Sequence, residues 1–140
     1  MPEGQARGTV RLRGNGELVL LVDDDPSVLA ICKAALEQSG YRAVASKDGR
    51  SALALFAKRH ADVSIVVTDL GMPGIDGGQV LTGVRKTKPS VKVVVCSGFL
   101  DEAERERLTN LGADAFLAKP YRSADLLRTL REAPGPVPAK

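Results

Sequence analysis

The sequence predicts an α/β fold, in which buried parallel strands alternate with helices in one domain. Short runs of Val, Leu and Ile recur along the chain without in–out alternation, which indicates strands that are buried on both faces of a sheet. Between these runs lie segments whose apolar residues recur at helical spacing. The length of 140 residues suits one compact domain.

Five strands are expected, of which the first, third and fourth are the strongest apolar runs. They lie at residues 18–22, 41–45, 63–68, 91–96 and 115–118. Since five strand–helix units follow one another, an open sheet with helices on both faces is predicted. The flavodoxin-like three-layer sandwich, a (βα)5 arrangement with strand order 2-1-3-4-5, is the leading choice, although the sequence alone does not fix the order.

Each helix is expected to follow a strand. Asp25 and Pro26 begin the first helix, because Asp caps free amides and Pro suits the first turn, and Gly40 ends it. Gly112 closes the fourth helix, and Ser123 is predicted to cap the fifth. The second, third and fourth helices are expected at about 49–59, 78–86 and 101–111. The apolar positions of the first helix are Val28, Ile31, Cys32, Ala35 and Leu36.

The domain is expected to span residues 17–133. Residues 1–16, rich in Gly and Arg, are interpreted as a flexible tail or linker, and residues 134–140, rich in Pro, as a disordered tail. The formal net charge is +3, of which +2 lies in residues 1–16, so the domain itself is nearly neutral. This charge balance gives little support to nucleic-acid binding.

A cytoplasmic location is expected. No stretch approaches the ~20 apolar residues that a membrane span needs, and the N-terminus lacks the pattern of a secretory signal. Cys32 and Cys96 are far apart in sequence and lie in apolar runs, so buried reduced thiols are predicted rather than a disulfide.

Chemically reactive side chains follow four of the predicted strands. Three aspartates at 23–25 follow the first strand, and Asp69 follows the third. Ser97 follows the fourth strand, and Lys119 follows the fifth. Because ligands bind beyond the carboxyl ends of parallel strands, these residues are expected to converge at one edge of the sheet.

Such a group of carboxylates predicts a bound cation. Carboxylates repel one another in a low-dielectric cleft unless a cation joins them, and Mg²⁺ is the natural hard cation for oxygen ligands. With the ion bound, Asp69 can attack a phosphorus centre. Lys119 can offset charge on the phosphoryl oxygens, and Ser97 can donate a hydrogen bond to one of them.

Four segments resemble the motifs of bacterial response regulator receiver domains, and they occur in order between residues 17 and 132. Residues 20–26 (LLVDDDP) resemble the opening acidic motif, and residues 68–77 (TDLGMPGIDG) resemble the phosphoacceptor loop. Ser97 and Gly98 match the switch hydroxyl and the small residue after it. Residues 118–120 (AKP) match the lysine motif, in which the Lys119–Pro120 peptide is usually cis in the family.

The resemblance implies specific roles for the residues that match. Asp69 would be the phosphoacceptor, and Ser97 and Lys119 would hold the phosphoryl group. Ser97 and Phe116 would be the switch residues. The same resemblance implies the set of metal ligands: Asp24 and Asp69 directly, Asp23 through water, and the backbone carbonyl of Gly71.

The expected function is therefore that of a signalling module rather than an enzyme. Its expected partners are a histidine kinase or phosphotransfer domain as donor, and a downstream protein or its own kinase core as target. Neither nucleic acid nor a membrane is expected as a partner, and a phosphorylation-dependent homodimer is left open. Residues 14–17 and 96–99 are similar to receivers attached to hybrid histidine kinases, which favours an excised domain over a stand-alone regulator.

Other interpretations remain open. A Mg²⁺-dependent phosphatase-like enzyme would also use an aspartyl nucleophile, but such enzymes usually carry a second acid two residues on, where Gly71 stands. A pseudo-receiver that binds partners without phosphorylation is a further alternative, which the complete set of acids, hydroxyl and amine argues against. Asp25 is either a helix cap or a residue next to the metal ligands, and His60 is interpreted as a surface residue at a helix end.

Overall fold

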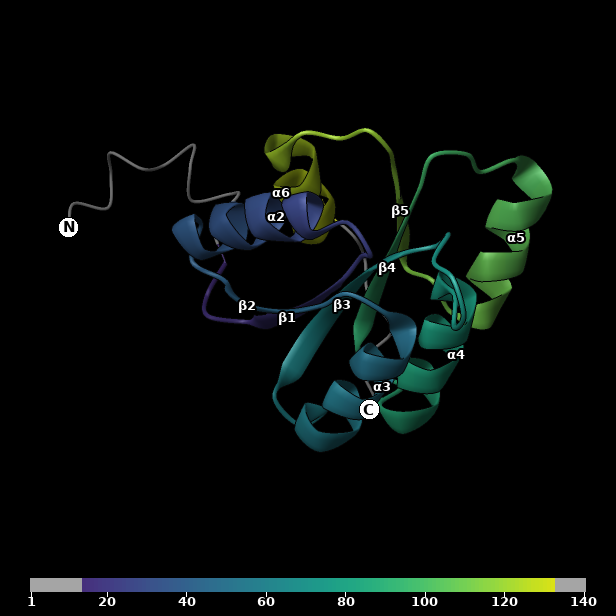
Figure 1. Ribbon diagram of the computed structural model, residues 1–140, viewed down its shortest axis with the longest axis horizontal. Helices are drawn as coiled ribbons and strands as arrows, with labels where there is room; N and C mark the ends of the chain where they lie inside the picture. Colours follow the sequence, from purple (N-terminus) through teal and green to yellow (C-terminus); the bar gives the residue numbers. More distant parts are fainter. Residues whose placement is uncertain (1–13, 133–140) are drawn as a thin grey trace.

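The computed structural model describes residues 14–132. They form one parallel sheet with strand order β2-β1-β3-β4-β5, covered by helices on both faces (Figure 1). The strands are β1 (Leu18–Val22), β2 (Arg42–Ser46), β3 (Val63–Asp69), β4 (Lys92–Ser97) and β5 (Ala115–Ala118). The helices are α2 (Pro26–Gln38), α3 (Gly49–Arg59), α4 (Gly77–Thr87), α5 (Glu102–Leu111) and α6 (Ser123–Glu132). The predicted fold class and strand order are confirmed.

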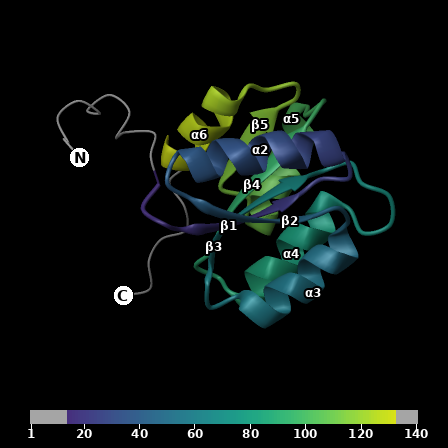
Figure 2. The same ribbon diagram turned by 60° about the vertical axis from the view of Figure 1, so that its left-hand side comes forward.

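The sheet separates two hydrophobic cores. Helices α2 and α6 lie side by side on one face, whereas α3, α4 and α5 cover the other face (Figures 1 and 2). Along β1, Leu18, Leu20 and Val22 point into the core beneath α3, α4 and α5, and Val19 and Leu21 point into the core beneath α2 and α6. Because both faces are covered, β1 is apolar at every position.

Aspartate caps begin four of the five helices. The carboxylates of Asp25, Asp48, Asp76 and Asp101 each accept a hydrogen bond from a backbone N–H in the first turn of the following helix. Helix α5 ends at Gly112, whose φ of 113° lies in the left-handed region that glycine adopts without strain. The aspartate caps thus place the starts of α2, α3, α4 and α5 immediately after the loops that follow the strands.

The element boundaries differ little from the predicted ones. Strands β3 and β4 each extend one residue further, to include Asp69 and Ser97. Ser123 is the first residue of α6 and not its cap. The carboxylate of Asp125 instead accepts a hydrogen bond from the backbone N–H of Arg122, at 3.0 Å. A side chain in the first turn of α6 thus stabilises the start of this helix.

The predicted tails lie mostly outside the described residues. Within the predicted tail 1–16, the backbone N–H groups of Gly14 and Gly16 donate to the carbonyls of Ser39 and Gly40, at 2.6 and 2.8 Å. These two residues therefore pack against the loop after α2. Residues 1–13 and 133–140 are not described. Among the helices of residues 14–132, none has the length and apolar character that crossing a bilayer requires.

Candidate phosphoacceptor site

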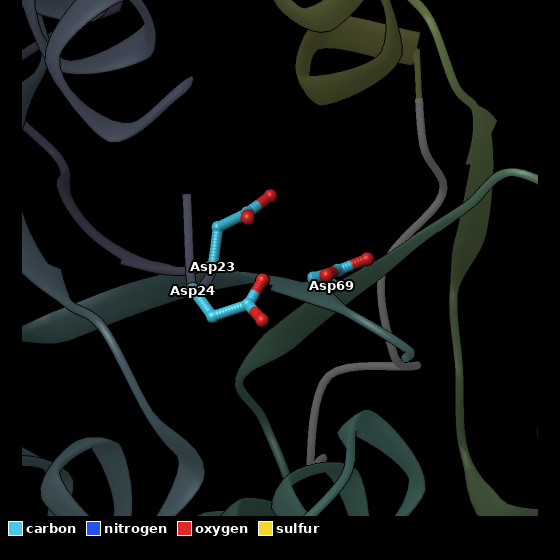
Figure 3. A group of neighbouring side chains, drawn as sticks. All are labelled: Asp23, Asp24 and Asp69. Atoms are coloured by element: carbon cyan, nitrogen blue, oxygen red, sulfur yellow. The ribbon is translucent and has the colours of Figure 1, made fainter. Parts of the chain in front are cut away.

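Three carboxylates meet at the carboxyl edge of the sheet. Asp23 and Asp24 directly follow β1, and Asp69 is the last residue of β3. Strands β1 and β3 are neighbours, and their register pairs Val22 with Thr68, so the residues that follow both strands lie together. Oxygen atoms of the three carboxylates lie within 4.8 Å of one another, and Asp24 extends toward Asp69 (Figure 3).

Lys119 joins this cluster from β5, which lies two strands away from β3. Its ammonium group donates a hydrogen bond to Asp23 at 3.0 Å and forms an ion pair with Asp69 at 3.3 Å. The backbone N–H of Lys119 donates to the Ser97 carbonyl at 2.9 Å, and the Lys119–Pro120 peptide bond is cis. Of the residues that the sequence predicted to converge, Asp23, Asp24, Asp69 and Lys119 are therefore brought together.

The burial of the site shifts its protonation equilibria. Burial and the nearby Asp23 charge raise the pKa of Asp69 above its usual value, and the charge of Lys119 opposes them. Burial alone would lower the pKa of Lys119, but its hydrogen bonds and ion pairs with Asp23 and Asp69 outweigh this effect and raise it. One ammonium group thus stabilises carboxylates that are otherwise crowded and poorly solvated.

The donor set fits a hard divalent cation. Asp23 and Asp69 are 5% and 7% exposed, whereas Asp24 is open to solvent. Lys119 pairs with two of the three carboxylates, so the cluster keeps an excess negative charge that a further cation would neutralise. Oxygen-only ligands with one side open to solvent are typical of Mg²⁺.

Asp25 and Gly71 differ in how they relate to this cluster. The Asp25 carboxylate caps α2, where it accepts from the N–H of Ser27 at 2.9 Å, and its own N–H donates to Asp23. The Asp25 carboxylate is therefore a helix cap, and the backbone of Asp25 also lies next to Asp23, as the other interpretation expected. Gly71 is exposed in the loop after β3, two residues beyond Asp69.

The hydroxyl group of Ser97 is not hydrogen bonded to Asp69. It donates to the backbone carbonyl of Phe99 at 2.9 Å and accepts from the N–H of the same residue at 3.1 Å. Both bonds involve the backbone of Phe99, a residue that is 77% exposed. Phe116 is half-buried on β5, and the guanidinium carbon of Arg105 lies 4.7 Å from the centre of its ring.

An apolar groove lies beside the carboxylates and was not predicted from the sequence. It has a volume of about 480 Å³, and its wall includes Ile31, Cys32, Lys119 and Tyr121. Ile31 shares the apolar spacing of α2, but it is 62% exposed because it points into this groove rather than into the core. The apolar periodicity of α2 was the only sequence feature that could have pointed to the groove, but such periodicity does not distinguish residues that line a groove from residues in the core.

Both cysteines are free thiols, and Cys32 lines the groove. The Sγ atom of Cys32 is 3.4 Å from the Tyr121 hydroxyl, and both Cys32 and Cys96 are buried. Burial raises the pKa of both thiols, that of Cys96 to about 12. The prediction of buried, unpaired cysteines is confirmed.

Comparison with known proteins identifies the family. Residues 19–131 match the model of the response regulator receiver domain. The chain is 37% identical to the sensor kinase CckA of Brucella abortus over 117 residues, which cover 81% of this chain and 12% of that protein. It is 35% identical to the transcriptional regulatory protein KdpE of Mycobacterium tuberculosis over 118 residues, which cover 83% of this chain and 50% of that protein.

The structure agrees with these sequence matches. The chemotaxis protein CheY4 of Vibrio cholerae superposes with a TM-score of 0.79 at 27% identity, over 84% of this chain and 98% of that chain. The chain spans half or less of the length of the curated relatives named above, so it corresponds to one part of each of them. The chain belongs to the receiver domain family of two-component response regulators.

Proposed function

We propose that Asp69 accepts a phosphoryl group from a phosphohistidine, which a histidine kinase or its phosphotransfer domain supplies. The observation that carries this proposal is the junction of Asp23, Asp24 and Asp69 with the ammonium group of Lys119. A buried carboxylate next to a lysine and two further acids is suited to charge-balanced phosphoryl transfer.

Asp24 and Asp69 would hold Mg²⁺ directly, with the carbonyl of Gly71 as a further ligand and Asp23 bound through water. The ion supplies charge neutralisation for the attacking carboxylate and for the phosphoryl oxygens. Asp24 is the exposed member of the cluster, so it is accessible to a hydrated ion from solvent. Gly71 lies in the exposed loop after β3, two residues beyond Asp69.

In the transfer step, a carboxylate oxygen of Asp69 forms a bond to phosphorus while the nitrogen–phosphorus bond of the donor histidine breaks. The electron pair of that bond returns to the imidazole nitrogen of the donor. Lys119, already 3.3 Å from Asp69, offsets the charge on the phosphoryl oxygens. For Ser97 to donate to a phosphoryl oxygen, its hydroxyl must leave the Phe99 carbonyl.

We assign the groove between α2 and the segment after β5 to the donor protein. Lys119 lines this groove and also pairs with Asp69, so a partner in the groove is held next to the phosphoacceptor. Ile31 is a large apolar side chain that is exposed at the groove, and Val28 and Pro120 add to its apolar wall. An amphipathic helix that carries the phosphohistidine is the occupant that suits such a surface.

The direct test is intact-protein mass spectrometry after incubation with acetyl phosphate and Mg²⁺. We expect an acid-labile gain of one phosphoryl group, which Asp69→Asn abolishes and Asp25→Asn retains, since Asn also caps helices. The adduct should also disappear when Mg²⁺ is chelated. An adduct that persists in Asp69→Asn, or its absence from the wild-type chain, would contradict the proposal.

We also propose that this domain belongs to a hybrid histidine kinase and acts in the cytoplasm. Similarity to the sensor kinase CckA and the motifs at residues 14–17 and 96–99 support the first point. The free thiols of Cys32 and Cys96 are compatible with a reducing compartment. Sequencing of the complete gene tests the proposal, because a hybrid kinase requires a kinase core upstream of residue 1.

A further inference from the structure

An arginine from the neighbouring helix covers the aromatic ring of Phe116. Phe116 is the second residue of β5 and packs, half-buried, against the core beneath α3, α4 and α5. The guanidinium carbon of Arg105, on α5, lies 4.7 Å from the centre of the ring. A cation at this distance is attracted to the ring, because the face of an aromatic ring carries negative charge density. The contact therefore favours the present orientation of the Phe116 side chain.

The guanidinium group of Arg105 contacts this ring and forms no ion pair with a carboxylate among residues 14–132. Arg107 on the same helix, by contrast, pairs with Glu104 at 2.8 Å. The buried side chain of α5 is Leu108. The Arg105 contact therefore joins α5 to β5 outside the buried Leu108.

We propose that Arg105 is a positioning residue that holds the Phe116 ring in the orientation seen here and thereby opposes switching. This inference rests on the proposed function of Asp69 and on the switch role that the resemblance implies for Phe116, whose ring would change position when Asp69 is phosphorylated. If phosphoryl binding favours a second ring position, that binding must also break the Arg105 contact, which lowers the affinity for the phosphoryl group. A variant without the contact should therefore bind a phosphoryl analogue more tightly.

Titration of the full chain with beryllofluoride in saturating Mg²⁺ measures this coupling. A cation–π contact at an exposed site corresponds to a factor of about 2–5 in an equilibrium constant. We expect Arg105→Gln to bind beryllofluoride more tightly by this factor. Arg107→Gln is the matched control, because it removes the same charge from the same helix without touching the ring, and it should bind like the wild type.

NMR of chains labelled with ring-¹³C phenylalanine provides a readout of the ring itself. The chain has three phenylalanines, so Phe116→Leu identifies the Phe116 resonance by its loss. In Arg105→Gln without beryllofluoride, this resonance should move toward its position in the bound wild-type protein. In the Phe116→Leu background, Arg105→Gln should leave the beryllofluoride affinity unchanged.

The outcomes separate the inference from the function on which it rests. Equal affinities in Arg105→Gln and Arg107→Gln, or an Arg105→Gln effect that survives in Phe116→Leu, would overturn the positioning role alone. Failure of the wild-type chain to bind beryllofluoride with Mg²⁺ would overturn the proposed function, and the inference with it.

Discussion

Replacement of Lys119 by glutamine tests whether charge, rather than packing, is the main contribution of this side chain. Lys119 lies 3.0 Å from Asp23 and 3.3 Å from Asp69, and each contact corresponds to a gross attraction of about 5 kcal/mol at an effective dielectric constant near 20. Most of this attraction is offset by the cost of removing the ammonium group from water. Breaking a buried pair costs about 3–5 kcal/mol. Because the lysine side chain is still 26% exposed, we expect a loss of about 2 kcal/mol at neutral pH.

Urea unfolding at a series of pH values and Mg²⁺ concentrations measures this loss. Since the folded-state pKa of Lys119 is raised, its stabilisation is present below the ordinary value of 10.5 and disappears as the pH rises through the folded-state pKa. In acid the difference also shrinks, because Asp69, whose pKa is raised, becomes protonated and no longer pairs with the ammonium group. Mg²⁺ should narrow the deficit of the variant, since the ion neutralises the same carboxylates.

Lys92 provides the control for this experiment. Its ammonium group donates to the Leu130 carbonyl at 3.0 Å and, within residues 14–132, has no carboxylate partner. Lys92→Gln should therefore show a deficit that does not vary with Mg²⁺. If the deficit of Lys119→Gln is equally constant across Mg²⁺ and pH, Lys119 acts through packing and the electrostatic argument is refuted.

Two further substitutions separate the cation site from the scaffold. Asp24→Asn should weaken Mg²⁺ binding about tenfold or more. It should not lower the stability in Mg²⁺-free buffer, because it relieves the repulsion between carboxylates. Calorimetric titration measures the Mg²⁺ affinity, and unchanged binding would remove Asp24 from the ligand set. Arg85 is largely buried and pairs with Asp114 at 2.9 Å, and it also donates to the carbonyls of Pro89 and Val91. Arg85→Met should lower the free energy of unfolding in urea by about 3 kcal/mol and leave the Mg²⁺ affinity of the folded protein unchanged. A weaker Mg²⁺ affinity in the folded variant would contradict the assignment of Arg85 to the scaffold alone.

The positions of the strands were predictable because burial on both sides of a sheet leaves a local mark on the sequence. Val63–Asp69 and Lys92–Ser97 each contain a continuous apolar run, and the polar residues that end them could be assigned to the edge of the sheet. Parallel topology then brings Asp69 near the acids that follow β1. The convergence of the candidate site thus follows from the pattern of strands.

Side-chain partners outside the carboxylate cluster could not be predicted in the same way. The spacing of Ile31 is that of a core residue, and only the position of the segment after β5 beside α2 shows that it is exposed at a groove. The hydroxyl of Ser97 could reach either Asp69 or its own loop, and the backbone conformation places it on Phe99. The contact of Arg105 with Phe116 depends on the packing of α5 beside β5, which no local spacing encodes.

The division of the interior by the sheet has a consequence for how such a domain diversifies. The groove assigned to the donor lies against α2, on one side of the strands, whereas Phe116 packs into the core on the opposite side. Under the proposed function, residues that contact the phosphoryl donor and residues that contact the downstream target would thus lie in separate hydrophobic layers. Each layer could accumulate substitutions with little repacking of the other, so a change of donor kinase would not require a change of target.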